Sequence, residues 1–307
     1  MLIMNDFREL TLEDQDLITP ILRRMRPTAS EFTFPYLYAW RRDYNLRFGI
    51  FGNHLCMVAN PRTYIPFAFC PIPVDGRHDI EDFRKALSAV EGHFREQDLD
   101  LVFARVEEGM VPLLTGYFKD RAEVSYLPEA SDYVYNSEDL IHLSGKKYSR
   151  KRNHISQFLR LYKDHEYVPV GPENTDECFR VFEEWCENNE SECRHPDNCE
   201  RLACRELLDN WERFGLKGGL VRVNGKAEAF TIGERLSGEM AAVRVEKGNA
   251  AIHGIYTFIN REFCTREWTD TKYVNREEDM GIEGLRKSKE SYFPAFMVKK
   301  YLVRCHP

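Results

Sequence analysis

The chain has 307 residues, of which 43% are hydrophobic, 13% aromatic and 30% charged. This composition excludes a disordered protein, and the length favours two domains at roughly 150 residues each. The longest run without a charged residue, Phe48 to Pro61, has fourteen residues, fewer than the about 20 that a membrane-spanning helix needs. The N-terminus lacks the basic patch and apolar stretch of a signal peptide, so we expect a cytoplasmic protein.

The net charge of −7 hides a strong local asymmetry. From Ser144 to Lys163 the chain carries seven Lys and Arg residues and no acid, whereas Glu173 to Glu206 carries eleven acids and four bases. A protein that is acidic overall does not attract nucleic acid along its whole length. The distribution predicts that a polyanion binds at the basic segment alone.

The first half of the chain opens with a helix signal. Thr11 and Asp14 have the spacing of a capping box, which predicts a helix to about Arg24, and an aromatic-rich helix is expected at Tyr36–Tyr44. The further elements expected in this half are a meander of strands at Leu46–Phe51, His54–Ala59 and Thr63–Phe69, a helix at Ile80–Gln97, a strand at Leu101–Val106, a helix at Val111–Phe118, and strands at Ala122–Leu127 and Tyr133–Tyr135.

A long basic helix at about Lys147–Lys163 joins this half to the second. There, Asn224-Gly225 is a strong signal for a two-residue hairpin turn. The elements expected in the second half are a strand at Tyr167–Val170, helices at Asn174–Asn188 and Cys199–Phe214, strands at Leu220–Val223, Ala227–Leu236 and Met240–Glu246, a helix at Ala251–Arg266, a strand at Lys272–Asn275, a helix at Ile282–Ser291, and a strand at Ala295–Val303.

Both halves share one order of elements: two helices, an antiparallel meander, and then a helix, a strand, a helix and a strand. This order resembles the GNAT acyltransferase fold, present twice. The fold class that we predict is therefore α/β with mixed sheets, in two tandem GNAT-like domains at residues 1–140 and 141–307.

Three segments carry a narrower resemblance. They are residues 144–155 (SGKKYSRKRNHI), 218–225 (GGLVRVNG) and 273–292 (YVNREEDMGIEGLRKSKESY). These segments resemble an uncharacterised bacterial family that is grouped with the C-terminal domain of phosphatidylglycerol lysyltransferase and, more distantly, with the Fem-type peptidyltransferases. The resemblance implies transfer of an acyl or aminoacyl group.

The turn after the third meander strand would receive the donor's phosphates in a GNAT-like domain, because a helix N-terminus there favours an anion. The first half supplies Pro71–Gly76, with two prolines and Asp75, so we expect the first domain to be degenerate. The second half is the predicted active domain and supplies a cation and small residues. The residues that we expect to bind the donor are Lys247, Gly248, Asn249, Ala250 and Ala251.

This turn departs from the coenzyme A pattern of GNAT enzymes, Arg/Gln-x-x-Gly-x-Gly/Ala. The departure fits the lysyltransferase and Fem-type relatives, whose donor is an aminoacyl-tRNA, better than it fits an acyl-CoA donor. The alternative interpretation is an ordinary strand-to-helix turn in which small residues only permit tight packing.

The basic segment is the candidate RNA-binding site. Lysine and arginine side chains neutralise phosphates and release counterions. The residues that we expect to contact RNA are Lys146, Lys147, Arg150, Lys151 and Arg152. The alternative is a solvated linker helix whose cations pair with the acidic segment from 173 to 206.

Candidate catalytic residues follow the predicted strand Lys272–Asn275, since the C-terminal end of a strand is the favoured position in an α/β sheet. The adjacent acids Glu277, Glu278 and Asp279 repel one another, which favours a raised pKa and a general base, or they anchor a donor amine. They alternatively cap the next helix. Glu246 is the second candidate base and Tyr292 the candidate acid.

Five cysteines cluster around His195, but no pair has the C-x-x-C spacing with which zinc sites usually start. We interpret these cysteines as free thiols and expect no metal site. They are Cys178, Cys186, Cys193, Cys199 and Cys204.

The function that we expect is direct transfer of an aminoacyl or acyl group to an amine or hydroxyl acceptor, with tRNA and a small-molecule or peptide acceptor as partners and no tightly bound cofactor. One alternative is a CoA-dependent N-acyltransferase. The other is a non-catalytic module that binds RNA or a partner protein on the same fold.

Overall fold

The computed structural model describes residues 6–62, 64–189 and 199–306. The chain divides into two compact units, each built around its own sheet. Unit 1 comprises Met1–Asp132, Glu278–Ile282 and Met297–Pro307, and unit 2 comprises Tyr133–Glu277 and Glu283–Phe296. None of the helices in the described ranges combines the length and apolar character needed to cross a membrane.

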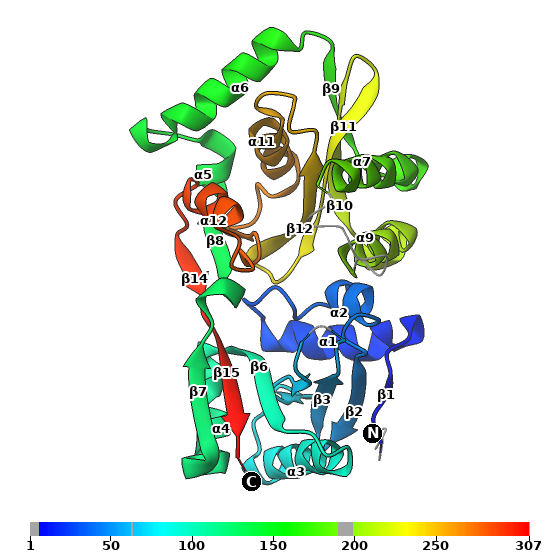
Figure 1. Ribbon diagram of the computed structural model, residues 1–307, viewed down its shortest axis with the longest axis vertical. Helices are drawn as coiled ribbons and strands as arrows, with labels where there is room; N and C mark the ends of the chain where they lie inside the picture. Colours follow the sequence, from blue (N-terminus) through cyan, green and yellow to red (C-terminus); the bar gives the residue numbers. More distant parts are fainter. Residues whose placement is uncertain (1–5, 63, 190–198, 307) are drawn as a thin grey trace. The chain divides into compact units, whose positions relative to one another are not determined.

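Unit 1 contains an 8-stranded sheet in the order β1-β2-β3-β4-β6-β15-β7, with β5 paired to β3 (Figure 1). Its strands are β1 (Arg8–Glu9), β2 (Arg47–Phe51), β3 (His54–Ala59), β4 (Phe67–Ala68), β5 (Ile72–Pro73), β6 (Leu101–Glu107), β7 (Ala122–Tyr126) and β15 (Lys300–Cys305). Its helices are α1 (Gln15–Met25), α2 (Phe34–Trp40), α3 (Ile80–Glu96) and α4 (Val111–Phe118).

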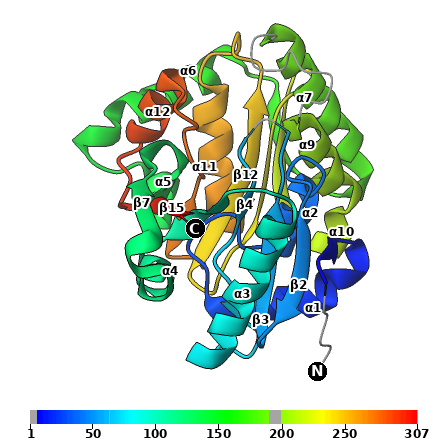
Figure 2. The ribbon, with the colours of Figure 1, turned by 60° about the horizontal axis from the view of Figure 1, so that its bottom comes forward.

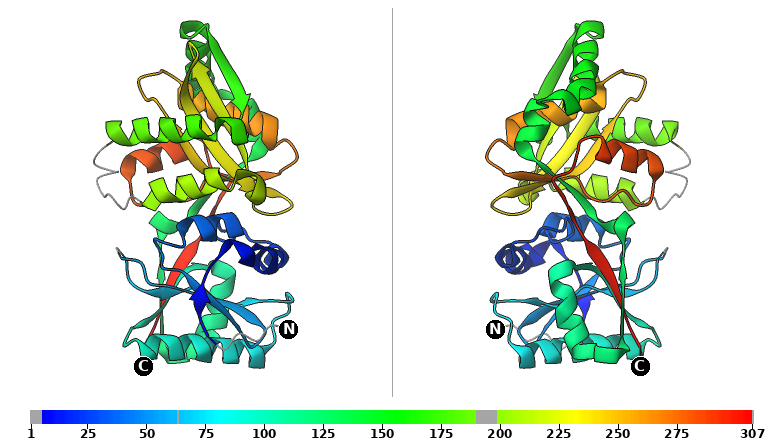
Figure 3. Two further views of the ribbon diagram at one scale, coloured as in Figure 1. Left: turned by 90° about the vertical axis from the view of Figure 1, so that its right-hand side faces the viewer. Right: turned by 90° about the vertical axis from the view of Figure 1, so that its left-hand side faces the viewer.

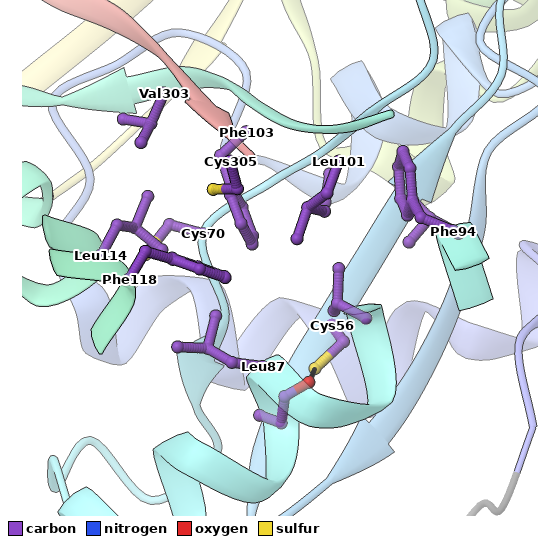
Figure 4. Packing of buried hydrophobic residues seen from close by; sticks show 14 of the residues in the cluster. Cys56, Cys70, Leu87, Phe94, Leu101, Phe103, Leu114, Phe118, Val303 and Cys305 are labelled. Atoms are coloured by element: carbon purple, nitrogen blue, oxygen red, sulfur yellow. Dashed lines mark hydrogen bonds between the residues drawn. The ribbon is translucent and has the colours of Figure 1, made fainter. Parts of the chain in front are cut away.

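Local sequence signals explain how the helices of unit 1 begin and pack. The predicted capping box is present, because the Thr11 backbone N–H donates to Asp14 Oδ2 at 2.9 Å. Asp79 caps α3, which lies along β2 and β3 (Figure 2). Phe83, Leu87 and Phe94 of α3 join a buried cluster with residues of β6 and β15 (Figure 4).

Unit 2 contains a 7-stranded sheet in the order β14-β8-β13-β12-β11-β10-β9. Its strands are β8 (Asp132–Asn136), β9 (His165–Pro169), β10 (Lys217–Val223), β11 (Lys226–Arg235), β12 (Met240–Gly248), β13 (Tyr273–Asn275) and β14 (Phe296–Val298). Its helices are α5 (Ser137–His142), α6 (Ser149–Leu161), α7 (Thr175–Asn188), α9 (Cys199–Asp209), α10 (Trp211–Phe214), α11 (Ile255–Glu267) and α12 (Glu283–Glu290).

The helices of unit 2 cover both faces of its sheet. The ribbon shows α7 and α9 on one face and α11 on the other (Figures 1 and 3). Residue contacts agree, since α7 packs on β11 and β12 while α11 packs on β10, β11 and β12. Ile155 and Phe158 of α6 are buried, as expected for one face of an amphipathic helix.

The strands are distributed differently from the predicted ranges 1–140 and 141–307. The predicted strand Ala295–Val303 is in fact two strands in different sheets, β14 and β15. β15 pairs antiparallel with both β6 and β7 in unit 1 (Figure 3), and β8 from the first half pairs with β13 in unit 2. Strand pairing is non-local, so element order alone could not reveal this exchange.

A buried charge cluster holds the start of β15 in unit 1. Lys300 Nζ lies 2.6 Å from both Glu31 Oε1 and Asp132 Oδ1, and all three side chains are 0% exposed. Arg105 also donates to Glu31. Burial opposes the charged amine, but the Asp132 and Glu31 carboxylates outweigh it and raise the pKa of Lys300.

Replacing Lys300 with Met should strongly destabilise unit 1, because Glu31 and Asp132 would lose their buried cation. We expect a loss of about 3–5 kcal/mol in the free energy of unfolding. The matched control is Lys299→Met, since the neighbouring Lys299 forms an exposed pair with Glu108, and water screens such surface pairs so that they add little stability. Urea unfolding curves measure both, and equal losses for the two variants would contradict the anchoring role of Lys300.

Candidate active site

The candidate site lies where β12 and β13 separate. The two strands pair in parallel over only three residue pairs, which end at Ala242 and Asn275. On β12, Val243 and Val245 pair with consecutive residues of β11, so Arg244 is the extra residue of a bulge. Bulges redirect side chains and are common beside active sites.

Two crossed ion pairs connect the strands beyond the end of their backbone pairing. Arg244 Nη1 donates to Glu277 Oε1 at 2.8 Å, and Arg276 Nη2 donates to Glu246 Oε1 at 2.9 Å. Arg244 also donates to Glu234 Oε1 at 2.8 Å and is almost fully buried. These pairs hold charged side chains in place between the diverging strands.

Glu246 connects two residues that retain unused hydrogen-bonding atoms. Asn260 of α11 donates from Nδ2 to Glu246 Oε2 at 3.1 Å. Among the described residues, the buried atoms Arg276 Nη1 and Asn260 Oδ1 have no hydrogen-bond partner. Buried polar atoms without partners are costly, so this donor and this acceptor are available to a polar ligand.

Lys151 of α6 adds an amine to the same cluster. Its Nζ donates to Ser291 Oγ at 2.7 Å and lies 3.6 Å from the centroid of the Tyr292 ring. Burial, with repulsion from Arg276 and Arg150, lowers the pKa of Lys151 to about 8. Burial also raises the pKa of Tyr292 to about 12. The cluster therefore holds an amine that gives up its proton near pH 8 and a phenol that keeps its proton.

The structure places the predicted catalytic residues in two groups. Glu246 and Tyr292 belong to the cluster around Arg276. The three adjacent acids have separate partners: Glu277 binds Arg244, Glu278 lies 3.4 Å from Arg105, and Asp279 accepts from the Gly281 N–H at 2.8 Å. Asp279 thus closes a local turn before α12, and the three carboxylates do not form one cluster.

The predicted donor loop offers few backbone donors for a phosphate. The N–H groups of Gly248, Asn249, Ala251, Ile252 and His253 all donate to protein oxygens. Lys247 Nζ lies 2.9 Å from Glu200 Oε1 and 3.6 Å from the centroid of the Trp185 ring. Residues 247–251 thus leave few backbone N–H groups for a phosphate, and the donor-binding role of this loop stays a prediction.

The basic residues around the start of α6 point in different directions. Lys146, Lys147 and Arg150 are exposed, and Lys147 Nζ lies 3.6 Å from Asp139 Oδ2. Arg152 donates to the backbone carbonyls of Leu143 and Gly145, and Lys151 faces the cluster.

The acidic segment from 173 to 206 has other partners. Five of its described acids, Asp176, Glu177, Glu183, Glu184 and Glu200, pair with cations of unit 2 outside the basic segment, namely Arg180, Arg201, Arg205, Arg222, Lys226 and Lys247.

Sequence reasoning missed the contributions of Arg244, Arg276 and Asn260. Asn260 was detectable in principle, because it is a polar residue on the buried face of α11, which is otherwise mostly apolar. The inward direction of Lys151 could not be predicted, because Lys151 lies between two other cations, Arg150 and Arg152, in the sequence. Arg276 directly precedes Glu277, Glu278 and Asp279, the three acids that were predicted to be catalytic.

The cysteine cluster shows ordinary buried thiols where it is described. Cys178 and Cys204 are buried and Cys186 is partly exposed. Burial raises the pKa of Cys178 and Cys204, which disfavours the thiolate form that metals bind. Cys193 and His195 lie outside the described residues.

The architecture of the two units is that of a tandem GNAT-like fold. A tandem GNAT protein from the clavulanic acid biosynthesis pathway superposes with a TM-score of 0.56 at 12% identity, covering 98% of this chain and 99% of that one. Residues 22–304 match the model of the family "phosphatidylglycerol lysyltransferase, C-terminal", and the chain belongs to this family.

Two further solved structures are similar to the chain. A conserved protein of unknown function from Bacteroides thetaiotaomicron is 33% identical, with a TM-score of 0.90 over 99% of this chain and 100% of that one. The C-terminal domain of a putative lysylphosphatidylglycerol synthetase from Agrobacterium fabrum is 15% identical, with a TM-score of 0.66 over 96% and 92%. The confirmed prediction is thus the fold and the family, whereas the site residues stay predictions.

The Lys151 amine should titrate near pH 8 in the folded protein. NMR of the lysine Cε–Hε groups measures this, and the resonance that titrates near pH 8 should vanish in Lys151→Met. Unfolded lysine has a pKa of about 10.4, so the unfolded chain binds more protons between these values. The free energy of unfolding should therefore rise from about pH 8 to about pH 10.4 more in the wild type than in the variant. Titration at the ordinary value would contradict the assignment.

Proposed function

We propose that this chain transfers an aminoacyl group from aminoacyl-tRNA to an amine or hydroxyl acceptor. The family and the GNAT-like fold support acyl or aminoacyl transfer as the reaction class. The observation that carries the finer proposal is the arrangement of α6. Lys151 faces the buried polar cluster, while its neighbours Lys146, Lys147 and Arg150 are exposed.

The start of α6 is suited to a polyanion. The exposed cations gather around the N-terminal end of a 13-residue helix, where the helix dipole also favours negative charge. A donor whose phosphates lie on these cations would present its reactive end close to Lys151. A long polyanion with an attached acyl group, such as an aminoacyl-tRNA, fits this division of charge.

The polar cluster suits an aminoacyl ester. Asn260 Oδ1 and Glu246 would accept hydrogen bonds from the α-ammonium group, and Arg276 Nη1 would donate to the ester carbonyl oxygen as negative charge develops there. Glu246, paired with Arg276 and Asn260, would thus anchor the amine rather than serve as the base.

The proton transfers fall to Lys151 in this proposal. The acceptor's nitrogen or oxygen attacks the ester carbonyl, and its proton passes to the neutral Lys151 amine. The bond from the carbonyl carbon to the ribose oxygen of the donor then breaks. That oxygen receives the proton from Lys151, which restores the neutral amine.

Titration with charged tRNA, uncharged tRNA and acetyl-CoA tests the proposal, with the heat of binding as the measurement. We expect charged tRNA to bind more tightly than uncharged tRNA. A triple variant with Lys146, Lys147 and Arg150 changed to Gln should weaken both and reduce the log–log salt slope by roughly two to three units, at about 0.7–0.9 per lost phosphate contact.

Two controls separate the alternatives. A triple variant with Lys217, Arg235 and Arg266 changed to Gln removes three exposed cations elsewhere in unit 2 and should bind as the wild type does. Lys151→Gln should keep tRNA binding. Saturable acetyl-CoA binding without tRNA binding would favour a CoA-dependent N-acyltransferase, and equal affinity for charged and uncharged tRNA would favour a non-catalytic RNA-binding module.

A further inference from the structure

The strand β7 forms one edge of the unit 1 sheet (Figures 1 and 3). Among the described strands, β7 pairs only with β15. All of its residues from Glu123 to Tyr126 are exposed, including the apolar side chains of Val124 and Tyr126. An exposed edge strand carries unpaired backbone groups, and it is therefore a template on which another strand can pair.

The direction of the free backbone groups follows from the pairing of β7 with β15. The Leu127 N–H, directly after β7, donates to the Lys300 carbonyl at 2.9 Å. The register of the two strands is continuous, and hydrogen-bonded residues alternate along an antiparallel ladder. The odd-numbered residues of β7 therefore bond to β15, whereas Ala122, Val124 and Tyr126 direct their backbone groups to the free edge.

These backbone groups are complementary to those of a second β7 strand that runs antiparallel, with the two Val124 residues facing each other on a two-fold axis. Each Val124 N–H would donate to the other Val124 carbonyl, and each Tyr126 N–H would donate to the Ala122 carbonyl of the second copy. The Ala122 N–H is not required, since it donates to the Lys119 carbonyl. A two-fold interface must be complementary to itself, and β7 meets this condition.

The same register brings apolar side chains together. Ala122, Val124 and Tyr126 share one face of β7, because successive residues of a strand point to opposite faces. On this face Val124 pairs with Val303 of the buried core, and the Tyr126 and Tyr301 ring centroids are 5.4 Å apart. A second copy would extend this apolar row and cover the exposed Val124 and Tyr126 side chains.

The opposite face of β7 would contain no conflict of charge. Glu123 would face Ser125 of the second copy, so the two Glu123 carboxylates would not lie opposite each other. Within its own chain, Glu123 has a partner in His306, whose Nε2 lies 3.5 Å away. Like charges directly opposite each other destabilise a strand pair, and this register contains none.

The other edges of the two described sheets are less suited to pairing. β1 has only two residues and β14 only three, and β9 carries His165, Glu166 and Pro169. Short strands, charged residues and proline are the features that protect sheet edges from pairing. β7 has no proline and pairs with β15 without a bulge, so it is the edge best suited to a further strand.

We propose that β7 is a homodimer interface, at which the edge strands of two copies pair antiparallel about Val124. The backbone hydrogen bonds would supply the affinity, and the alternating side chains would fix the register. A single strand pair is at the small end of specific interfaces, so we expect a reversible dimer with micromolar affinity. The dimer does not depend on the proposed transfer reaction.

Sedimentation velocity over a range of protein concentrations tests this inference. We expect the mass to rise from 36.2 kDa toward twice this value as the concentration increases. Val124→Lys should weaken association at least about tenfold, because it places two like charges opposite each other on the axis. Val124→Pro should also weaken it, since it removes the N–H that faces the second copy and none that faces β15.

The matched control is Ser125→Lys, which introduces the same charge one residue further along the strand. Its new side chain would face Glu123 of the second copy, so association should be at least as strong as in the wild type. Melting curves verify that each variant folds. A wild type that stays monomeric up to millimolar concentration, undiminished association of Val124→Pro, or equal losses in the two lysine variants would each overturn the proposal. No tRNA is present in these measurements, so their outcome is separate from that of the proposed function.

Discussion

The contact on which unit 1 depends is that of Lys300 with Glu31 and Asp132. A lysine with no exposure to water is stable only because two carboxylates neutralise it, and those carboxylates are equally dependent on the lysine. Lys300 is the first residue of β15, the strand that lies between β6 and β7 and pairs with both. The ion pair therefore selects the position of the strand that joins the two parts of the first sheet.

A comparable constraint shapes unit 2. β13 is only three residues long and lies between β8 and β12, so its backbone pairing with β12 ends at Asn275. Beyond this point side-chain ion pairs connect the two strands, and the space between the strands is filled by charged groups. β13 is too short to pair with β12 beyond Asn275. The buried charged side chains in this region therefore pair with one another, and these ion pairs form the polar cluster.

Local signals predicted the elements well, as Thr11 and Asp14 illustrate, since a capping box depends on residues close in sequence. The exchange of β8 and β15 escaped prediction because strand pairing is decided by contacts between residues far apart in the sequence, such as Tyr273 with Asn136 and Lys300 with Glu107. Residues 295–303 were also predicted as one strand, whereas the chain changes sheet at Lys299.

The candidate site was predictable only in part. Glu246 was chosen from its place at the end of a predicted strand, and the structure brings it together with Tyr292, the predicted acid, beside Arg276. Lys151 follows Arg150 directly in α6, and one residue corresponds to a rotation of about 100° around a helix axis. This rotation places the Lys151 amine in the cluster and the Arg150 guanidinium in solvent. The sequence, a run of similar cations, does not reveal it.

Lys247 shows how neighbours decide what a charge does. In the sequence it is a cation beside small residues at a helix start, which favours a phosphate site. In the fold, Lys247 Nζ pairs with Glu200 and lies over the Trp185 ring. The charge of Lys247 is therefore neutralised within the protein. At the start of α6, by contrast, Lys146 and Arg150 are exposed to solvent, whereas Lys147 Nζ lies 3.6 Å from Asp139 Oδ2.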